Sequence, residues 1–159
     1  MDRMVAVVDI DGVVADVRHR LHHLDKQPKD WAAFFAAAPA DPVLDAGVDA
    51  VRRLAEVYEI IYLSGRPEGC RSDTEEWLAR HAFPEGQVRL RALGDRRPAR
   101  ITKVEELRRI AEVATVAVLV DDDPQVCEAA LAAGFDVLPA TWMERSDTLT
   151  EAQEDDGRT

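Results

Sequence analysis

Cysteine is scarce in this chain of 159 residues, which has only Cys70 and Cys127, far apart in the sequence. A disulfide-rich scaffold is therefore excluded, and we expect both residues to be free, reduced thiols in a cytoplasmic protein. The sequence also lacks any apolar run that approaches the length of a membrane span, and no signal peptide is expected at its start. These absences predict a protein that does not act on a membrane.

Positive charge is also in short supply. The formal net charge is −11, which argues against broad, sequence-independent binding to nucleic acid. Residues 85–110 depart from this balance, because they hold eight basic and four acidic side chains. That region could receive a phosphate or could form a solvated face. Residues 144–159, the acidic segment, hold six acids and two arginines, and we expect them to form a flexible tail.

The chain also lacks an internal repeat, a linker and a Gly-rich phosphate-binding loop of Walker type. A kinase activity that depends on such a loop is therefore not expected. We expect a single domain over residues 1–143, followed by the acidic tail.

Strand-like apolar runs alternate with helical patterns along the chain. This alternation predicts a three-layer α/β/α, Rossmann-like fold with a mostly parallel sheet covered on both faces. An irregular stretch after the first strand, at about residues 12–45, is expected to form a flap or small cap. The strand-like runs are residues 5–8, 59–63, 88–93, 116–120 and 135–138, and the helical patterns are residues 30–36, 46–57, 70–82, 103–113 and 124–133.

Two aspartates, Asp9 and Asp11, directly follow the first apolar run. The two-residue period of a strand points them the same way, and Gly12 lets the chain turn away beside them. Two carboxylates held this close repel each other. Either a divalent cation relieves the repulsion, or the two take different protonation states as a nucleophile and a general acid. A strand followed by an Asx-rich turn would carry the same residues without any chemistry.

Polar side chains suited to phosphoryl chemistry follow other apolar runs. Ser64 follows the second run, the pair Asp121-Asp122 follows the run before the last helix, and Lys103 is expected to open a helix between them. Parallel strands end at one rim of the sheet, where open α/β sheets bind their ligands. A phosphate dianion needs a cation, a hydroxyl or backbone donor, and a lysine or arginine. Together these residues predict a phosphoryl-transfer site.

Their order resembles the four motifs of haloacid dehalogenase superfamily phosphatases. The second aspartate matters in this comparison, because the family's dehalogenases lack it and need no acid for a phosphoester leaving group. Asp11 therefore favours a phosphatase. The motifs are Asp9-Ile10-Asp11-Gly12-Val13, Leu63-Ser64-Gly65-Arg66, Lys103 and Val120-Asp121-Asp122, and they span residues 5–123.

The resemblance implies a role for each candidate catalytic residue. Asp9 would attack phosphorus and form an aspartyl-phosphate, and Asp11 would protonate the leaving oxygen and then activate water. Ser64 and Lys103 would bind the phosphoryl oxygens.

The resemblance also implies Mg²⁺ as the cofactor. Asp9, the backbone carbonyl of Asp11 and an aspartate of the 121–122 pair would hold it. Asp122 is favoured as the direct ligand and Asp121 as its support, although the two could exchange roles. Asp123 is expected to cap the helix that follows it.

Further stretches are similar to the 3′-phosphatase domain of bacterial and phage polynucleotide kinase/phosphatase. In that family, an arginine of the flap and the arginine of the Ser-Gly-Arg motif contact the substrate phosphate. This implies substrate binding by Arg20 and Arg66, with Gly12 and Gly65 at the same site. The similar stretches are Arg18–Leu24 and residues 64–67, 74–78 and 94–98.

Two positions depart from that family. It often has an aspartate four residues before the lysine, where this chain has Ala99, and an arginine at the position of Asp123. Both departures weaken the inference that the substrate is the 3′ end of a nucleic acid.

Three functions therefore remain open. We favour a Mg²⁺-dependent phosphomonoesterase that acts on a polynucleotide or nucleotide 3′-phosphate. The alternative enzyme is a small-molecule 5′- or 3′-nucleotidase or an acid-phosphatase-like hydrolase, and the acidic charge and Ala99 favour it. The short segment between Asp11 and Ser64 leaves room only for a small cap, and an open site would admit bulky ends. A non-catalytic binding module on the same fold is the third. No obligate protein partner is expected.

The flap region carries His19, His22 and His23 at a spacing that would place them on one helical face. No cysteine or fourth ligand lies nearby, so a zinc site is not expected. The remaining interpretations are that these histidines lie near a bound phosphate, or that they are packed or solvated side chains with no such role.

Overall fold

The computed structural model describes residues 2–159, in which five parallel strands form one sheet with the order β3-β2-β1-β4-β5. β1 (Met4–Val8) lies at its centre. β2 (Glu59–Pro67) and β3 (Gly86–Arg91) follow on one side, and β4 (Thr115–Asp121) and β5 (Val137–Pro139) on the other. All strands run the same way, so the carboxyl ends of β1, β2 and β4 meet at one rim.

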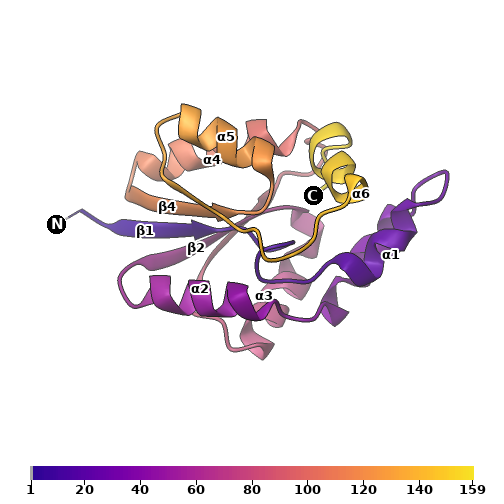
Figure 1. The fold of residues 1–159 in the computed structure, drawn as a ribbon, viewed down its shortest axis with the longest axis horizontal. Helices are drawn as coiled ribbons and strands as arrows, with labels where there is room; N and C mark the ends of the chain where they lie inside the picture. The colour runs from indigo at the N-terminus through magenta and orange to yellow at the C-terminus, as the bar shows by residue number, and fades with distance from the viewer. Residues whose placement is uncertain (1) are drawn as a thin grey trace.

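Helices cover both faces of this sheet (Figure 1). α2 (Asp45–Ala55) and α3 (Arg71–Arg80) pack on one face, and α4 (Ala99–Ala111) and α5 (Pro124–Ala132) pack on the other. The expected three-layer α/β/α fold with a parallel sheet is therefore confirmed.

The position of β1 at the centre of the sheet explains why its sequence is continuously apolar. Ala6 and Val8 join the cluster under α2 and α3, whereas Val5 and Val7 join the cluster under α4 and α5. All four side chains are fully buried, because successive residues of a strand point to opposite faces. Burying one valine side chain contributes about 1.5–3 kcal/mol, so β1 anchors both layers of helices.

The helix that carries Lys103 begins one turn earlier than expected. α4 starts at Ala99, because the carbonyl oxygen of Pro98 already accepts hydrogen bonds from the amides of Ile101 and Thr102, at 3.0 and 3.2 Å. Lys103 therefore lies in the second turn and does not open the helix.

The flap contains three short helical pieces, η1 (Arg18–Leu24), α1 (Trp31–Ala36) and η2 (Ala38–Ala40). Asp30 caps α1 by accepting a hydrogen bond from the amide of Ala33 at 3.0 Å. Phe34 of α1 is fully buried and packs with residues of η1.

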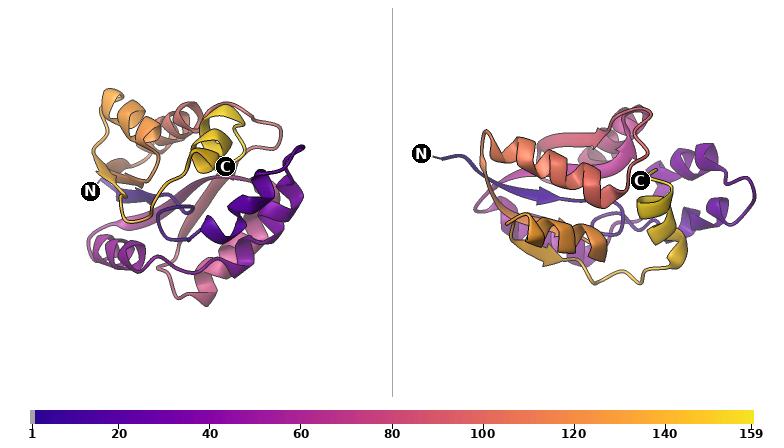
Figure 2. Two further views of the ribbon diagram at one scale, coloured as in Figure 1. Left: turned by 45° about the vertical axis from the view of Figure 1, so that its right-hand side comes forward. Right: turned by 90° about the horizontal axis from the view of Figure 1, so that it is seen from above.

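The acidic segment, which was expected to form a flexible tail, is folded in the structure. It forms α6 (Asp147–Thr150) and a π-helical turn, η4 (Glu151–Asp155), which lie beside the flap in both views of Figure 2. Leu149 and Ala152 are fully buried in the cluster that contains Phe34. The amino-acid composition of the segment, in which acids dominate, favoured disorder. These two apolar side chains nevertheless pack into a core that forms only when the flap is folded.

Between residues 2 and 159, no helix is both long and apolar enough to cross a membrane.

Candidate active site

The rim of the sheet brings the sequence-predicted site residues together. Asp9 follows β1, Ser64 lies in the last part of β2, and Asp121 ends β4. The amide of Asp9 donates to the carbonyl of Val120 at 2.9 Å, which ties the ends of β1 and β4 together. The side chains of this group are buried, with relative exposures of 0 to 3%. Buried charged groups must be paired or neutralised, so their partners decide what the site can do.

Lys103 lies between two of these carboxylates. Its Nζ is 3.1 Å from Oδ2 of Asp9 and donates to Oδ2 of Asp121 at 2.6 Å. Asp121 is further fixed because its Oδ1 accepts a hydrogen bond from the amide of Asp123 at 3.0 Å. Lys103 thus reaches the rim from α4 and holds Asp9 against β4.

The protonation of this group follows from burial and charge. Burial raises the pKa of Asp9 well above its ordinary value; Lys103 offsets part of this, and the Asp121 and Asp122 carboxylates add to it. Burial opposes the charged form of Lys103, but Asp121 and Asp9 outweigh it and raise the pKa of the lysine. A further positive charge beside Asp9 would stabilise its ionised form.

Asp9, Asp121 and Asp122 form a cluster suited to a cation. Each offers a carboxylate oxygen, and these oxygens lie within 4.8 Å of one another. Among residues 2–159, nothing donates a hydrogen bond to the buried Oδ2 of Asp9 or to Oδ1 of Asp122. Burial, and then the Asp121 carboxylate, raise the pKa of Asp122 to about 7. A cluster of carboxylate oxygens with an excess of negative charge is suited to binding Mg²⁺.

Gly12 makes room for this cluster. It adopts a φ of +81°, and a Cβ at its position would overlap the Asp122 carboxylate. We expect Gly12→Ala to displace Asp122 and to weaken Mg²⁺ binding by about tenfold or more, the loss seen when groups that orient metal ligands are changed. Isothermal titration calorimetry with Mg²⁺ measures this.

Gly94→Ala is the matched control for Gly12→Ala. Gly94 has a similar φ of +82°, but a Cβ there meets no atom within 4 Å. Equal Mg²⁺ affinities of the two variants would contradict a role for Asp122 in the cation site.

Asp11 lies in a different environment from Asp9. Its Oδ1 accepts hydrogen bonds from Nη2 of Arg20 at 2.9 Å and from Nη2 and Nε of Arg66 at 2.6 and 3.1 Å. Its Oδ2 accepts a hydrogen bond from the Thr159 hydroxyl at 2.9 Å. Burial favours the neutral acid, but Arg66 and Arg20 outweigh it and hold the pKa of Asp11 well below its ordinary value. Their different surroundings therefore raise the pKa of Asp9 and lower the pKa of Asp11.

Asp41 shares the two arginines with Asp11. Its carboxylate accepts from Nε and Nη2 of Arg20 at 2.8 and 2.9 Å, and from Nη2 of Arg66 at 3.2 Å. The side chains of Arg20, Arg66 and Asp41 are almost fully buried. The flap and β2 thus converge on one charged network, with both guanidinium groups beside Asp11.

Ser64 and Gly65 complete the rim at β2. The Ser64 hydroxyl accepts a hydrogen bond from the amide of Arg66 at 3.1 Å, which shapes the turn of the Ser-Gly-Arg motif. A hydroxyl so placed can still donate its own proton to a phosphoryl oxygen.

Three charged or polar residues of the site were not identified from the sequence. Asp41 lies between Pro39 and Pro42, with no motif around it. Arg145, in the acidic segment, makes an ion pair with Asp122, and Thr159 contacts Asp11. The basic charge of Arg145 among acids was a visible signal, but it does not reveal the partner.

The histidines of the flap do not gather into a metal site. His19 lies 2.6 Å from Asp41 through its Nε2, and His22 packs on His23 with ring centroids 4.0 Å apart. In the described part of the chain, the group with metal-ligand geometry contains only the three aspartates.

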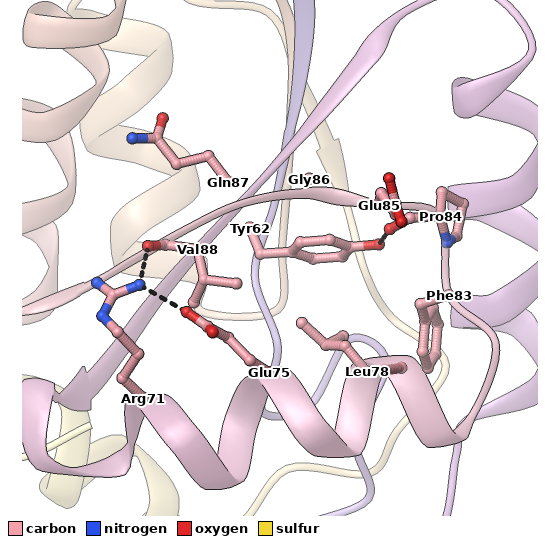
Figure 3. A pocket seen from close by; sticks show the side chains of 11 residues that line it. Tyr62, Arg71, Glu75, Leu78, Phe83, Pro84, Glu85, Gly86, Gln87 and Val88 are labelled. Atoms are coloured by element: carbon pink, nitrogen blue, oxygen red, sulfur yellow. Dashed lines mark hydrogen bonds and ion pairs between the residues drawn. The ribbon is translucent and has the colours of Figure 1, made fainter.

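A pocket of about 530 Å³ lies apart from this rim, between α3 and β3 (Figure 3). Figure 3 shows Tyr62 crossing it, with its hydroxyl donating to the carbonyl of Pro84 at 2.6 Å. Arg71 closes one end by donating to Glu75 and to the carbonyl of Val88. None of the candidate catalytic residues lines this pocket.

The fold and the residues at the rim place this chain in the haloacid dehalogenase class. Within this class, the chain belongs to the family described as the polynucleotide kinase PNKP phosphatase domain, whose profile it matches over residues 3–141.

Solved structures share the fold at low sequence identity. The Pnkp1/Rnl/Hen1 complex contains a chain that is 22% identical with a TM-score of 0.71; the match covers 89% of this chain and 47% of that one. A haloacid dehalogenase-like hydrolase from Streptococcus pneumoniae is 13% identical with a TM-score of 0.63, over 96% and 92% of the two chains. A HAD family enzyme from Bacteroides thetaiotaomicron, in complex with magnesium and inorganic phosphate, is 14% identical with a TM-score of 0.54, over 92% and 98%.

The curated relatives match only a short stretch. Membrane-associated phosphatidylinositol transfer protein 2 of Mus musculus and of Homo sapiens is 42% identical over 60 residues. This stretch is 36% of this chain and 4% of those proteins. The chain thus spans a small fraction of these relatives and about half of the Pnkp1 chain.

Proposed function

We propose that this chain is a Mg²⁺-dependent phosphomonoesterase with Asp9 as its nucleophile, and that it acts on the 3′-phosphate of a polynucleotide or nucleotide. The contrast between the two acids of the first motif carries this proposal. Oδ2 of Asp9 accepts no hydrogen bond and lies 3.1 Å from the Lys103 ammonium, close to the other aspartates, whereas two arginines donate hydrogen bonds to Asp11.

In this proposal, Asp9 would attack phosphorus. Its Oδ1 is fixed by the amide of Ile10 at 2.7 Å, which leaves Oδ2 for chemistry. Lys103 would bind a phosphoryl oxygen together with the Ser64 hydroxyl, and would reduce the repulsion between the Asp9 carboxylate and the phosphate dianion. Asp9 and Asp122, supported by Asp121, would hold Mg²⁺, which would supply further positive charge at the phosphoryl group.

Asp11 would act as the general acid and then as the general base. A general acid must carry a proton, yet Arg20 and Arg66 keep Asp11 ionised while they are bound to it. A substrate phosphate would compete for both guanidinium groups. As they turn toward the phosphate, the burial of Asp11 would raise its pKa, the carboxylate would take up a proton from solvent, and the carboxyl group would then give that proton to the leaving oxygen. The resulting Asp11 carboxylate would activate the water that hydrolyses the aspartyl-phosphate.

The choice of a 3′-phosphate rests on the family and on the positions of the two arginines. Arg20 comes from the flap and Arg66 from the Ser-Gly-Arg motif, which are the positions that contact the substrate phosphate in the family. Asp123, which replaces an arginine of the family, caps α5 by accepting from the amide of Gln125 at 2.9 Å. Ala99 is fully buried in the apolar layer under α4. Both departures therefore have structural roles here.

A comparison of substrates tests this proposal. We expect Mg²⁺-dependent release of phosphate, with kcat/KM for a 3′-phosphorylated oligonucleotide at least about tenfold above that for 3′- and 5′-mononucleotides, because contacts to the strand add binding energy. EDTA should abolish the activity, and Asp9→Asn serves as the blank. Equal rates on oligonucleotide and mononucleotide would contradict specificity for polynucleotide ends.

A small-molecule nucleotidase is the second candidate, because a small ligand needs a smaller opening of this buried site than a polynucleotide end does. Arg20 and Arg66 have relative exposures of 0% and 1%, so a bulky end must open the site before it can bind. A clear preference for 5′- or 3′-mononucleotides in the same comparison would support this alternative.

A further inference from the structure

The acidic segment reaches into the candidate active site. The Thr159 hydroxyl donates to Oδ2 of Asp11 at 2.9 Å, and Nη2 of Arg91 donates to the Thr159 carbonyl at 3.4 Å. The backbone of Thr159 lies directly on Gly65, where a Cβ would overlap it. Figure 1 shows this end of the chain at the rim of the sheet. Thr159 thus lies on two motifs that are proposed to handle the phosphoryl group.

The same segment also contacts the cation cluster. Arg145 makes an ion pair with Asp122, and its Nη2 donates to the side chains of Thr150 and Gln153 at 3.1 and 2.7 Å. One arginine therefore joins α6 and η4 to a carboxylate that is proposed to bind Mg²⁺.

Basic residues hold the acidic segment in place. Lys29 of the flap pairs with Glu151 at 2.8 Å and with Asp156 at 2.6 Å, and Arg100 of α4 pairs with Glu154 at 2.6 Å. The segment therefore spans from the flap to α4 and crosses the mouth of the site between them. Beneath its acids lie positive charges that a polyanionic strand could also use.

With the segment in this position, the candidate catalytic side chains are almost fully buried. Asp9, Ser64 and Lys103 are 2 to 3% exposed, and Thr159 itself is 4% exposed. The segment must move before a substrate can enter.

We propose that the acidic segment is an autoinhibitory lid that competes with a polyanionic substrate for the same basic residues. Its acids pair with Lys29 and Arg100 in the closed state, and Thr159 keeps Asp11 bonded. This inference rests on the proposed function, because the substrate that displaces the segment is taken to be a strand with a 3′-phosphate. Weakening the closed state should raise the apparent affinity for substrate, since only the open fraction binds it.

Removing the charges that pair with Lys29 tests the lid. The double variant Glu151→Gln/Asp156→Asn should speed amide hydrogen exchange over residues 146–159 and raise kcat/KM for p-nitrophenyl phosphate about two- to tenfold, because partly exposed ion pairs contribute modestly. The matched control is Asp147→Asn/Asp155→Asn. It removes the same charge from two exposed acids of the segment, neither of which pairs with a base among residues 2–159. The control should leave both measurements near wild type.

Faster exchange with an unchanged or lower kcat/KM would overturn the lid, because an open segment would then not favour substrate entry. If Glu151→Gln/Asp156→Asn leaves amide hydrogen exchange unchanged, Gly157→Val is tested in its place. The same two measurements, hydrogen exchange and kcat/KM, then decide the outcome. Gly157 has a φ of +59°, and a Cβ there would overlap the carbonyl of Arg96, so this variant should expel the segment.

A binding measurement separates this inference from the proposed function. If wild type hydrolyses no phosphoester, the proposed function fails, and calorimetry with inorganic phosphate then tests the lid. Tighter phosphate binding by the loosened variant than by the control would support the lid, and equal binding would overturn it.

Discussion

Asp9→Asn is expected to lower kcat for every phosphoester by at least about 10³-fold, because removal of the attacking atom stops the first chemical step. The asparagine keeps the size and hydrogen-bonding geometry of the side chain. Its amide nitrogen cannot attack phosphorus and it carries no negative charge for a cation. The measurement is steady-state hydrolysis of p-nitrophenyl phosphate with saturating Mg²⁺.

Asp16→Asn is the matched control for this variant. It makes the same change seven residues away, at an acid that pairs with Arg18 at 2.7 Å outside the rim cluster. We expect its activity to stay near wild type, and thermal unfolding checks that both variants fold. An active Asp9→Asn variant would show that another residue, or water, attacks phosphorus.

Asp11→Asn is expected to have the second largest effect, and its size should depend on the leaving group. For a 3′-phosphorylated nucleotide, kcat should fall about 10²–10⁴-fold, because the departing alkoxide then receives no proton. p-Nitrophenolate leaves without protonation. With that substrate, a rapid burst of one equivalent should precede slow turnover, since the asparagine cannot activate water.

Stopped-flow absorbance with the two kinds of substrate checks this expectation. Arg20 and Arg66 keep Asp41 as a partner in the variant, so the buried guanidinium groups remain paired. Equal losses on both substrates, with no burst, would contradict the acid and base role of Asp11. The variant would then have lost a positioning contact and not a proton donor.

Most of the candidate site could be predicted from the sequence, because its residues come from local patterns. Asp9, Ser64 and Asp121 each follow an apolar run, and parallel strands must end at the same rim. This rule placed them together without knowledge of any contact. Lys103 was placed by its order among the motifs, although its helix begins at Ala99.

The charged partners of these residues could not be predicted in the same way. Asp41 contacts Arg20 and Arg66 only because the flap folds back over β2. No periodic pattern in the sequence indicates that the chain folds back in this way. The resemblance to the family implied that Arg20 and Arg66 bind substrate, but it gave no indication that both hold Asp11 in the structure described here.

The acidic segment shows how composition can mislead. Its charge suggested disorder, yet Leu149 and Ala152 pack against the flap, and Lys29 pairs with two of its acids. The stability of such a segment depends on surfaces that are distant in sequence, so its own residues do not reveal it. Once folded, the segment brings Thr159 and Arg145 to the rim.

Trapping the covalent intermediate would identify the residue that attacks phosphorus. Asp11→Asn would be mixed with p-nitrophenyl phosphate and Mg²⁺, quenched, and reduced with borohydride, which converts an aspartyl-phosphate to homoserine. Tryptic cleavage releases residues 4–18 as one peptide, and mass spectrometry locates the change within it. We expect homoserine at position 9. An unmodified Asp9 during the burst, or a modification at another residue, would contradict it.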